Sequence, residues 1–221
     1  MKIIAKIYND FTDKFGIPRQ SGIADSIISK IVFEKEYRDP SALKGIEDFS
    51  HLWLIWNFSE VKKEKWSPTV RPPRLGGNKR IGVFATRSPF RPNPIGLSCV
   101  KLIKTETTSS EGTVIYVSGA DILNGTPIYD IKPYVPYSDC KTDAKGSFTE
   151  FTKDYKLDVF CEEKLLNKIP YNKQKNLLEI LSSDPRPSYH NDKDRIYGLD
   201  FAGFNIKFTV DEKELSVKEI T

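Results

Sequence analysis

The stretch from Arg71 to Ser98 has the residue types of an anion-binding loop. It reads RPPRLGGNKRIGVFATRSPFRPNPIGLS and contains six basic residues, five prolines and four glycines, but no acidic residue. Guanidinium groups make planar contacts with phosphates and carboxylates, while proline stiffens the backbone and glycine lets a ligand approach it. The functional interpretation is a groove for a phosphate- or carboxylate-bearing partner. The alternative is a solvated loop whose arginines pair with carboxylates elsewhere.

Three shorter segments contain groups that could contribute to a binding site. Residues 18–20, Pro-Arg-Gln, offer a fork of donors and an amide, although a plain surface turn is the simpler explanation. Residues 121–127, DILNGTP, contain an Asn-Gly turn whose backbone groups and Thr126 hydroxyl could also face a ligand. Residues 184–189, DPRPSY, are typical either of a helix stop or of a rigid arm with a charge and a stacking ring.

The composition is that of a soluble globular protein and argues against several classes of site. The chain has 221 residues, and its net charge of +4 is by itself a weak indicator of nucleic-acid binding. No apolar run approaches the roughly 20 residues that cross a bilayer, and the N-terminus lacks a secretory signal pattern. Three scattered cysteines and two distant histidines predict free thiols in a reducing compartment and no metal site. The dinucleotide-binding, P-loop and nucleophile-elbow motifs are absent from the sequence.

The elements that must position these residues are mostly short strands. Alternation or short apolar runs predict strands at residues 1–8, 27–35, 52–58, 81–85, 97–104, 113–118 and 128–132. We therefore expect a mainly β fold, with a closed β-barrel domain over residues 1–135 that carries the binding segments. Residues 136–156 are polar and aromatic and are expected to form a linker or long loop.

A small α+β domain is predicted over residues 157–221. We expect a strand at 157–160, a helical turn at 162–168 and a helix at 172–181 that Asn172 can cap. Apolar residues alternate with polar ones over residues 204–210, which is the clearest half-buried strand pattern in the chain. A tight polar turn at 211–213 joins this strand to a second one at 215–217.

Residues 70–78 and 82–98 closely resemble the central motif of the TrmO family, formerly called TsaA-like or YaeB-like. Residues 18–20, 49–53, 124–127 and 184–189 match the family in the same order. The resemblance implies a cytoplasmic, S-adenosylmethionine-dependent methyltransferase that acts on tRNA. Its substrate would carry N6-threonylcarbamoyladenosine beside the anticodon, and the methyl group would go to the N6 nitrogen. The resemblance also implies a barrel that forms a homodimer.

Carried over by motif, the resemblance implies a cofactor site and a tRNA surface. The residues implied to contact the cofactor are Pro18, Arg19, Gln20, Ser59, Glu60, Arg87, Leu97, Asn124, Gly125, Thr126 and Pro127. Ser59 and Glu60 depart from the family, whose members have a basic or amide residue there. The residues expected to contact tRNA are Arg71, Arg74, Lys79, Arg80, Arg91 and Arg186.

Methyl transfer from a sulfonium requires alignment and desolvation but no covalent nucleophile. The accepting nitrogen is ureido-like and must lose its proton, so a general base is expected. Asp121, Asp130 and Tyr189 are candidates by residue type and by proximity to the motifs. Two other interpretations stay open: a non-catalytic RNA-binding barrel, and a hydrolase of acidic small molecules, which lacks a visible nucleophile or metal-ligand set.

Overall fold

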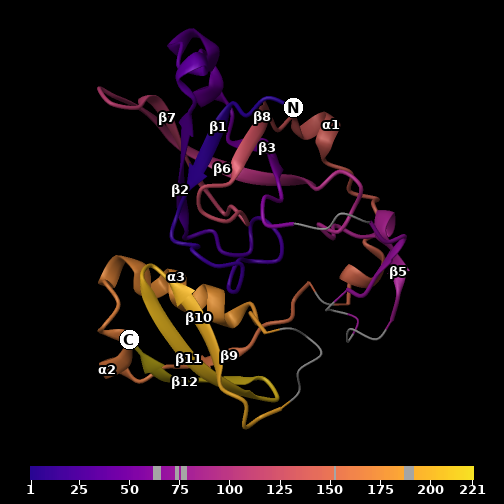
Figure 1. Ribbon diagram of the computed structural model, residues 1–221, viewed down its shortest axis with the longest axis vertical. Helices are drawn as coiled ribbons and strands as arrows, with labels where there is room; N and C mark the ends of the chain where they lie inside the picture. The colour runs from indigo at the N-terminus through magenta and orange to yellow at the C-terminus, as the bar shows by residue number, and fades with distance from the viewer. Residues whose placement is uncertain (62–65, 73–74, 76–78, 152, 187–191) are drawn as a thin grey trace.

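The computed structural model describes residues 1–221 except 62–65, 73–74, 76–78, 152 and 187–191 (Figure 1). The fold is mainly β, as predicted. Its N-terminal sheet consists of β1 (Ala5–Tyr8), β2 (Ile28–Phe33), β3 (His51–Asn57), β6 (Ile95–Thr108), β7 (Gly112–Ser118) and β8 (Pro127–Pro133). β1 pairs with β2 on one side and with β8 on the other, so the six strands close into a barrel in the order β1-β2-β7-β6-β3-β8.

Strand β3 shows how the sequence specifies an inside and an outside for this sheet. Leu52, Leu54 and Trp56 are buried, while the residues between them are only partly buried. Because successive side chains of a strand point to opposite faces, these three residues fill the interior, where they pack with residues of β1, β2, β7 and β8. Ile55 lies on the other face, paired in register with Leu97 of β6 and Asp130 of β8. Leu97 and Asp130 therefore face outwards.

The predicted strand at residues 81–85 is wrong in its second half. Only Ile81–Gly82 (β5) pairs, with Thr69–Val70 (β4), and Val83–Ala85 forms a 3-10 turn. The Thr86 hydroxyl donates a 2.8 Å hydrogen bond to the Val83 carbonyl, and the Thr86 N–H donates to the same oxygen. This local bonding ends the strand and folds the basic stretch back on itself.

The second sheet is formed by the C-terminal third of the chain. Its order is β10 (Tyr197–Phe201), β11 (Phe204–Asp211), β12 (Glu214–Ile220) and β9 (Asp158–Phe160), with β9 parallel to β12. Helix α3 (Tyr171–Ser182) buries Leu177, Ile180 and Leu181 in the same core as this sheet, and α2 (Glu163–Leu166) is one short turn. The helix begins at Tyr171 with Pro170 at its N-cap, so the predicted cap at Asn172 is wrong.

The remaining helical pieces are short. Three 3-10 turns, Lys35–Tyr37, Pro40–Leu43 and Ile46–Asp48, connect β2 to β3. In the second of them, the Asp39 carboxylate accepts a hydrogen bond from the Ser41 N–H and so caps the turn. The segment of the chain between β8 and β9 contains α1 (Pro136–Asp139) and a 3-10 turn at Ser147–Thr149, within the region predicted as a long loop.

Residues 9–27, here called the crossing loop, connect β1 to β2 but pack into the core of the C-terminal sheet. Phe11 and Ile27 are almost completely buried there, and the Phe11 and Phe201 rings lie 6.5 Å apart. At Gly16, whose φ is +88°, an added Cβ would come within 2.0 Å of the Leu199 side chain. The two cores are therefore not divided at residue 135, because an N-terminal segment completes the C-terminal one.

Candidate functional site

A chain of hydrogen bonds runs from the inside of the barrel to a carboxylate. The Trp56 indole donates to the Ser98 hydroxyl at 2.9 Å, and this hydroxyl donates to the Asp121 carboxylate at 2.5 Å. Ser98 is buried because it occupies an inward position of β6, next to the outward Leu97. The chain fixes the orientation of Asp121 at the point where the strand β7 has ended and the loop to β8 begins.

Burial raises the pKa of the Asp121 carboxyl above its ordinary value of 3.8. The Ser98 hydrogen bond, the nearby Arg87 guanidinium and the Ser21 N–H each stabilise the ionised form and oppose this rise. The carboxylate is thus a proton acceptor of increased basicity that is held in place by donors from β6 and from the crossing loop. Such a combination is typical of a functional carboxylate.

Gln20 and Arg87 bring the crossing loop and the basic stretch together. The Arg87 guanidinium donates a 2.5 Å hydrogen bond to the Gln20 side-chain oxygen. Gln20 precedes Ser21, whose N–H faces Asp121, so Gln20, Arg87 and Asp121 form one cluster. The structure therefore unites residues from three of the segments that the sequence singled out.

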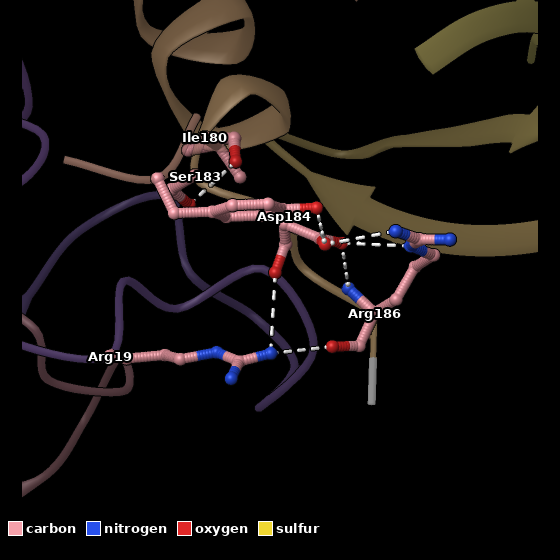
Figure 2. Close-up of polar contacts among 6 residues, drawn as sticks. Arg19, Ile180, Ser183, Asp184 and Arg186 are labelled. Atoms are coloured by element: carbon pink, nitrogen blue, oxygen red, sulfur yellow. Dashed lines mark hydrogen bonds and ion pairs between the residues drawn. The ribbon is translucent and has the colours of Figure 1, made fainter. Parts of the chain in front are cut away.

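Arg19, next to Gln20, points toward the turn that follows α3 (Figure 2). Its guanidinium donates to the carbonyl of Arg186 at 2.5 Å and to that of Asp184 at 3.4 Å. Pro18, beside it, is buried. Arg19 was expected to contact a cofactor directly, whereas the structure shows its guanidinium bound to a backbone turn of the C-terminal region.

The loop at residues 124–127 is tied to the end of β1. The Asn124 side-chain oxygen accepts a 3.0 Å hydrogen bond from the Asn9 N–H, and the Gly125 N–H donates to the Ile7 carbonyl at 2.7 Å. Gly125 has a φ of +79°, as the predicted Asn-Gly turn requires. Thr126 is buried, and Pro127 begins β8. This loop directly follows the Asp121 region and forms an ordered rim beside it.

Aromatic and basic side chains lie together where Trp66 meets the second half of the basic stretch. Phe84 and Trp66 are 72% and 51% exposed, and their ring centroids lie 6.1 Å apart. The Arg91 guanidinium lies 6.0 Å from the Phe84 ring centroid and donates to the Thr86 carbonyl. No acidic residue occurs in the sequence from 65 to 105. We call the exposed rings of Trp66, Phe84 and Phe90, together with the half-buried Arg91, the aromatic platform.

The other predicted tRNA contacts have different positions. Arg71, Lys79 and Arg80 are exposed, and Arg80 donates a 2.7 Å hydrogen bond to the Thr69 hydroxyl. Arg74 lies outside the described residues. Arg186 was expected on an exposed arm, but it is only 8% exposed, because its guanidinium binds both oxygens of the Asp184 carboxylate at 2.9 and 3.0 Å (Figure 2). In this structure Arg186 is therefore committed to a buried ion pair.

Several other predicted site residues lie apart from the Asp121 cluster. Asp130 is on the outer barrel face, where its carboxylate pairs with Lys132 at 2.9 Å. Leu97 is on the same outer face and is 54% exposed. Ser59 and Glu60 are exposed in the turn after β3. Tyr189 lies outside the described residues. Among the three candidate bases, Asp121 is the one that the described structure joins to the predicted binding segments.

Sequence reasoning missed the residues that position the site. Trp56 was seen only as part of a strand and Ser98 only as a strand residue at the end of the basic stretch, although a serine at an inward strand position between apolar neighbours is a signal for a buried hydrogen bond. Asp184 was treated as part of a helix stop, and Tyr155, whose hydroxyl donates to the Asp184 carboxylate at 3.3 Å, was not singled out. These contacts join residues far apart in the chain, which explains why local patterns did not reveal them.

The described part of the chain contains neither a membrane-spanning helix nor a cluster of metal-binding side chains. No helix there has the length and apolar character needed to span a membrane. No group of three or more histidine, cysteine, aspartate or glutamate side chains there is arranged to hold a metal ion.

Comparisons with known proteins match the whole length of the chain. The family described as "tRNA-methyltransferase O N-terminal domain" matches residues 6–140, and the "TrmO C-terminal domain" matches residues 155–221. The tRNA (adenine(37)-N6)-methyltransferase of Escherichia coli K12 is 36% identical over 97% of this chain and 94% of its own. A relative from Eikenella corrodens with the same name is 39% identical over 74% of this chain and 92% of its own.

Solved structures agree with the sequence matches. A crystal structure of TrmO from Pseudomonas aeruginosa superimposes with a TM-score of 0.76 at 28% identity, covering 99% of this chain and 97% of that one. Another TrmO crystal structure gives a TM-score of 0.79 at the same identity and coverage. The chain therefore belongs to the tRNA-methyltransferase O (TrmO) family.

Proposed function

We propose that the protein is an S-adenosylmethionine-dependent tRNA methyltransferase that methylates the N6 nitrogen of adenosine 37, beside the anticodon. The observation that carries the proposal is the full-length match to the E. coli enzyme of that name. The name of a Pseudomonas aeruginosa relative, 37% identical over 89% of this chain and 86% of its own, assigns it provisionally to the S-adenosylmethionine-dependent methyltransferases. We further propose that the substrate base is N6-threonylcarbamoyladenosine, as the motif resemblance implies.

The residues around Asp121 fit a ligand that has both charged and polar groups. Gln20 and Arg87 offer an amide and a guanidinium, and Asn124 in the neighbouring loop is exposed. We assign the cofactor to this cluster. The motif also implies cofactor contacts from Pro18, which is buried, and from Leu97, Ser59 and Glu60, which lie apart from the cluster in this structure. When bound, the cofactor supplies the methyl group as a sulfonium substituent.

Asp121 is the proposed general base. The N6 nitrogen of a carbamoylated adenosine is flanked by a purine and a carbonyl, so its lone pair is delocalised and its proton must leave during attack. A carboxylate of raised pKa accepts a proton more readily than an ordinary aspartate. The Trp56–Ser98 chain holds the carboxylate oxygen in a fixed direction, and its donors stabilise the charge before the proton arrives.

The aromatic platform is the proposed resting place of the anticodon loop. Sequence-specific recognition of RNA usually involves unpaired bases that stack on aromatic side chains or guanidinium planes. Phe84 and Trp66 supply exposed rings, and Arg91 supplies a guanidinium beside them. Arg71, Lys79 and Arg80, and Arg74 outside the described residues, are assigned to phosphates, which basic side chains attract over a long range.

The proposed enzyme acts with its tRNA substrate in the cytoplasm, and we propose that it does so as a homodimer. Sedimentation of the purified chain tests the second point directly. A single species of about 25 kDa, the mass of one chain, would contradict it.

Mass spectrometry of nucleosides from tRNA incubated with protein and S-adenosylmethionine tests the proposed function. A gain of one methyl group on threonylcarbamoyladenosine is expected. A gain of one methyl group on unmodified adenosine would support the proposed methyltransferase activity but contradict the proposed substrate base. The second candidate, a non-catalytic RNA-binding barrel, is favoured by the aromatic platform alone. It predicts tRNA binding without saturable heat on titration with S-adenosylmethionine.

A further inference from the structure

The turn that follows α3 has features that its position at a helix end does not require. Asp184 has a φ of +55°, a left-handed conformation that is uncommon for residues other than glycine. Its carboxylate binds the Arg186 guanidinium through both oxygens and also accepts hydrogen bonds from the Arg186 N–H and the Tyr155 hydroxyl. The turn is thus held in a strained shape by an ion pair that is almost fully buried.

The turn directs two backbone carbonyls at Arg19 (Figure 2). The carbonyl oxygens of Asp184 and Arg186 both accept from the same guanidinium nitrogen of Arg19. A guanidinium has five donors in a rigid plane, so fixing it fixes the backbone from which it extends. The next two residues, Gln20 and Ser21, are those that face Arg87 and Asp121.

We propose that Asp184 and Arg186 are positioning residues for the cofactor loop. They act through Arg19 to hold Gln20 and Ser21 at the Asp121 cluster, and they contact neither cofactor nor RNA themselves. The inference rests on the proposed function, because it concerns the same cofactor site. It assigns the C-terminal region a role in cofactor binding, and it replaces the expectation that Arg186 contacts tRNA.

Other contacts between the crossing loop and α3 provide a matched control. Lys173 on α3 forms a 2.7 Å ion pair with Asp10, near the start of the crossing loop and nine residues before Arg19. Breaking this pair removes a polar contact that also joins the crossing loop to the C-terminal region. It leaves the Arg19 contacts in place, so it separates a loss of general docking from a loss of loop positioning.

The test compares Arg186→Met and Asp184→Asn with Lys173→Met. Asparagine tolerates the left-handed conformation, so Asp184→Asn keeps the turn while weakening the ion pair. We expect either variant to raise the Kd for S-adenosylmethionine, measured by calorimetry, by about tenfold, a typical coupling between distant groups. The Kd for tRNA should not change. Lys173→Met should lower the melting temperature and leave both Kd values as in the wild type.

A double-mutant cycle with Arg19→Ala decides whether the effect passes through Arg19. If it does, Arg19→Ala combined with Arg186→Met binds the cofactor no more weakly than Arg19→Ala alone. Additive losses would overturn the inference, as would an unchanged cofactor Kd in both turn variants. If only the Kd for tRNA were raised, Arg186 would be a tRNA contact and the inference would be wrong. A wild-type protein that gives no saturable heat with S-adenosylmethionine would overturn the proposed function itself.

Discussion

The Ser98 hydroxyl donates a 2.5 Å hydrogen bond to the Asp121 carboxylate, and this bond joins the barrel interior to the proposed site. The hydroxyl has one proton, so donating it to Asp121 leaves its lone pairs to accept from the Trp56 indole. The three groups therefore have one consistent direction of donation, and it ends on the carboxylate. An aspartate held in this way is stabilised in its ionised form although burial opposes ionisation.

Replacing Ser98 by alanine should move the acid limb of the pH–rate profile to higher pH. The Ser98 hydrogen bond lowers the pKa of Asp121, so its loss lets burial raise this pKa further. A base must be ionised to accept a proton, so the variant becomes active only at higher pH. Methyl transfer under single-turnover conditions between pH 5 and 9 measures the shift. Thr113→Val, which removes another buried barrel hydroxyl, should leave the profile unchanged.

Asp121→Asn should lose activity and gain stability at neutral pH. Loss of a general base typically costs about 10²- to 10⁴-fold in rate. The folded-state pKa of Asp121 is raised, so protonation stabilises the folded protein at low pH and that contribution is lost as pH rises through the folded pKa. Asparagine mimics the protonated carboxyl, so the variant keeps this contribution to stability as pH rises. Its advantage in melting temperature over the wild type should shrink toward acid pH, and a less stable variant at pH 7 would contradict the assignment.

Phe84→Ala and Arg91→Ala should weaken tRNA binding in different ways. Removing a stacking ring typically costs about 1–3 kcal/mol and leaves the salt dependence of binding unchanged. Removing Arg91 also removes a positive charge from the RNA surface, so it reduces the slope of log K against log salt by roughly 1. Filter binding over a range of salt concentrations separates the two. Lys164→Ala, in the exposed turn α2, is the control, and wild-type affinity in both platform variants would exclude the aromatic platform as the RNA surface.

Gly96→Ala should disturb the Trp56–Ser98–Asp121 chain from inside the strand. A Cβ at Gly96 would lie 2.2–2.5 Å from atoms of the Trp56 ring, so the ring must move. Overpacking of this kind typically costs about 1–3 kcal/mol of stability. Gly82→Ala is a suitable control because a Cβ there meets nothing within 4 Å. Chemical unfolding of both variants, with the pH–rate profile of Gly96→Ala, tests the link between packing and the carboxylate.

Phe11→Ala should destabilise the C-terminal sheet, although Phe11 belongs to the N-terminal part of the sequence. The side chain is 1% exposed and packs with Phe201, so its truncation should cost about 3–5 kcal/mol. Phe151, which is 91% exposed, is the control, because truncating it removes almost no buried surface. If native-state hydrogen exchange of β10 and β11 were equally slow in Phe11→Ala and in the wild type, the shared core would be disproved.

Alternation and turn signals in the sequence were sufficient to predict most of the strands. The strand at 204–210, the hairpin of β6 and β7 and the Asn-Gly turn at Gly125 are all present. Local patterns failed where a local bond overrides them: residues 83–85 are apolar enough for a strand, but Thr86 closes a 3-10 turn. They failed again at Asn172, because Pro170 starts the helix two residues earlier.

The candidate site could be predicted as a set of segments but not as a set of contacts. Gln20, Arg87 and Asp121 were each selected from their own motif, and only the fold shows that they meet. Arg19 and Arg186 were both expected to bind ligands, since an arginine in a stiff polar segment has the same appearance whether it faces solvent or a carboxylate. The sequence does not show that the Asp184 carboxylate binds Arg186, or that the Asp184 carbonyl accepts a hydrogen bond from Arg19.

The placement of the crossing loop also limits how the chain can be divided. A shortened chain that ends before β9 would leave Phe11, Ala24 and Ile27 without the sheet and helix that now cover them. These apolar side chains would then form an exposed surface near Gln20, and the shortened chain would be expected to self-associate. The C-terminal third of the chain therefore also covers apolar side chains of the crossing loop. Whether by gene truncation or by design, a functional barrel on its own would require polar replacements in the loop at the same time as the cut.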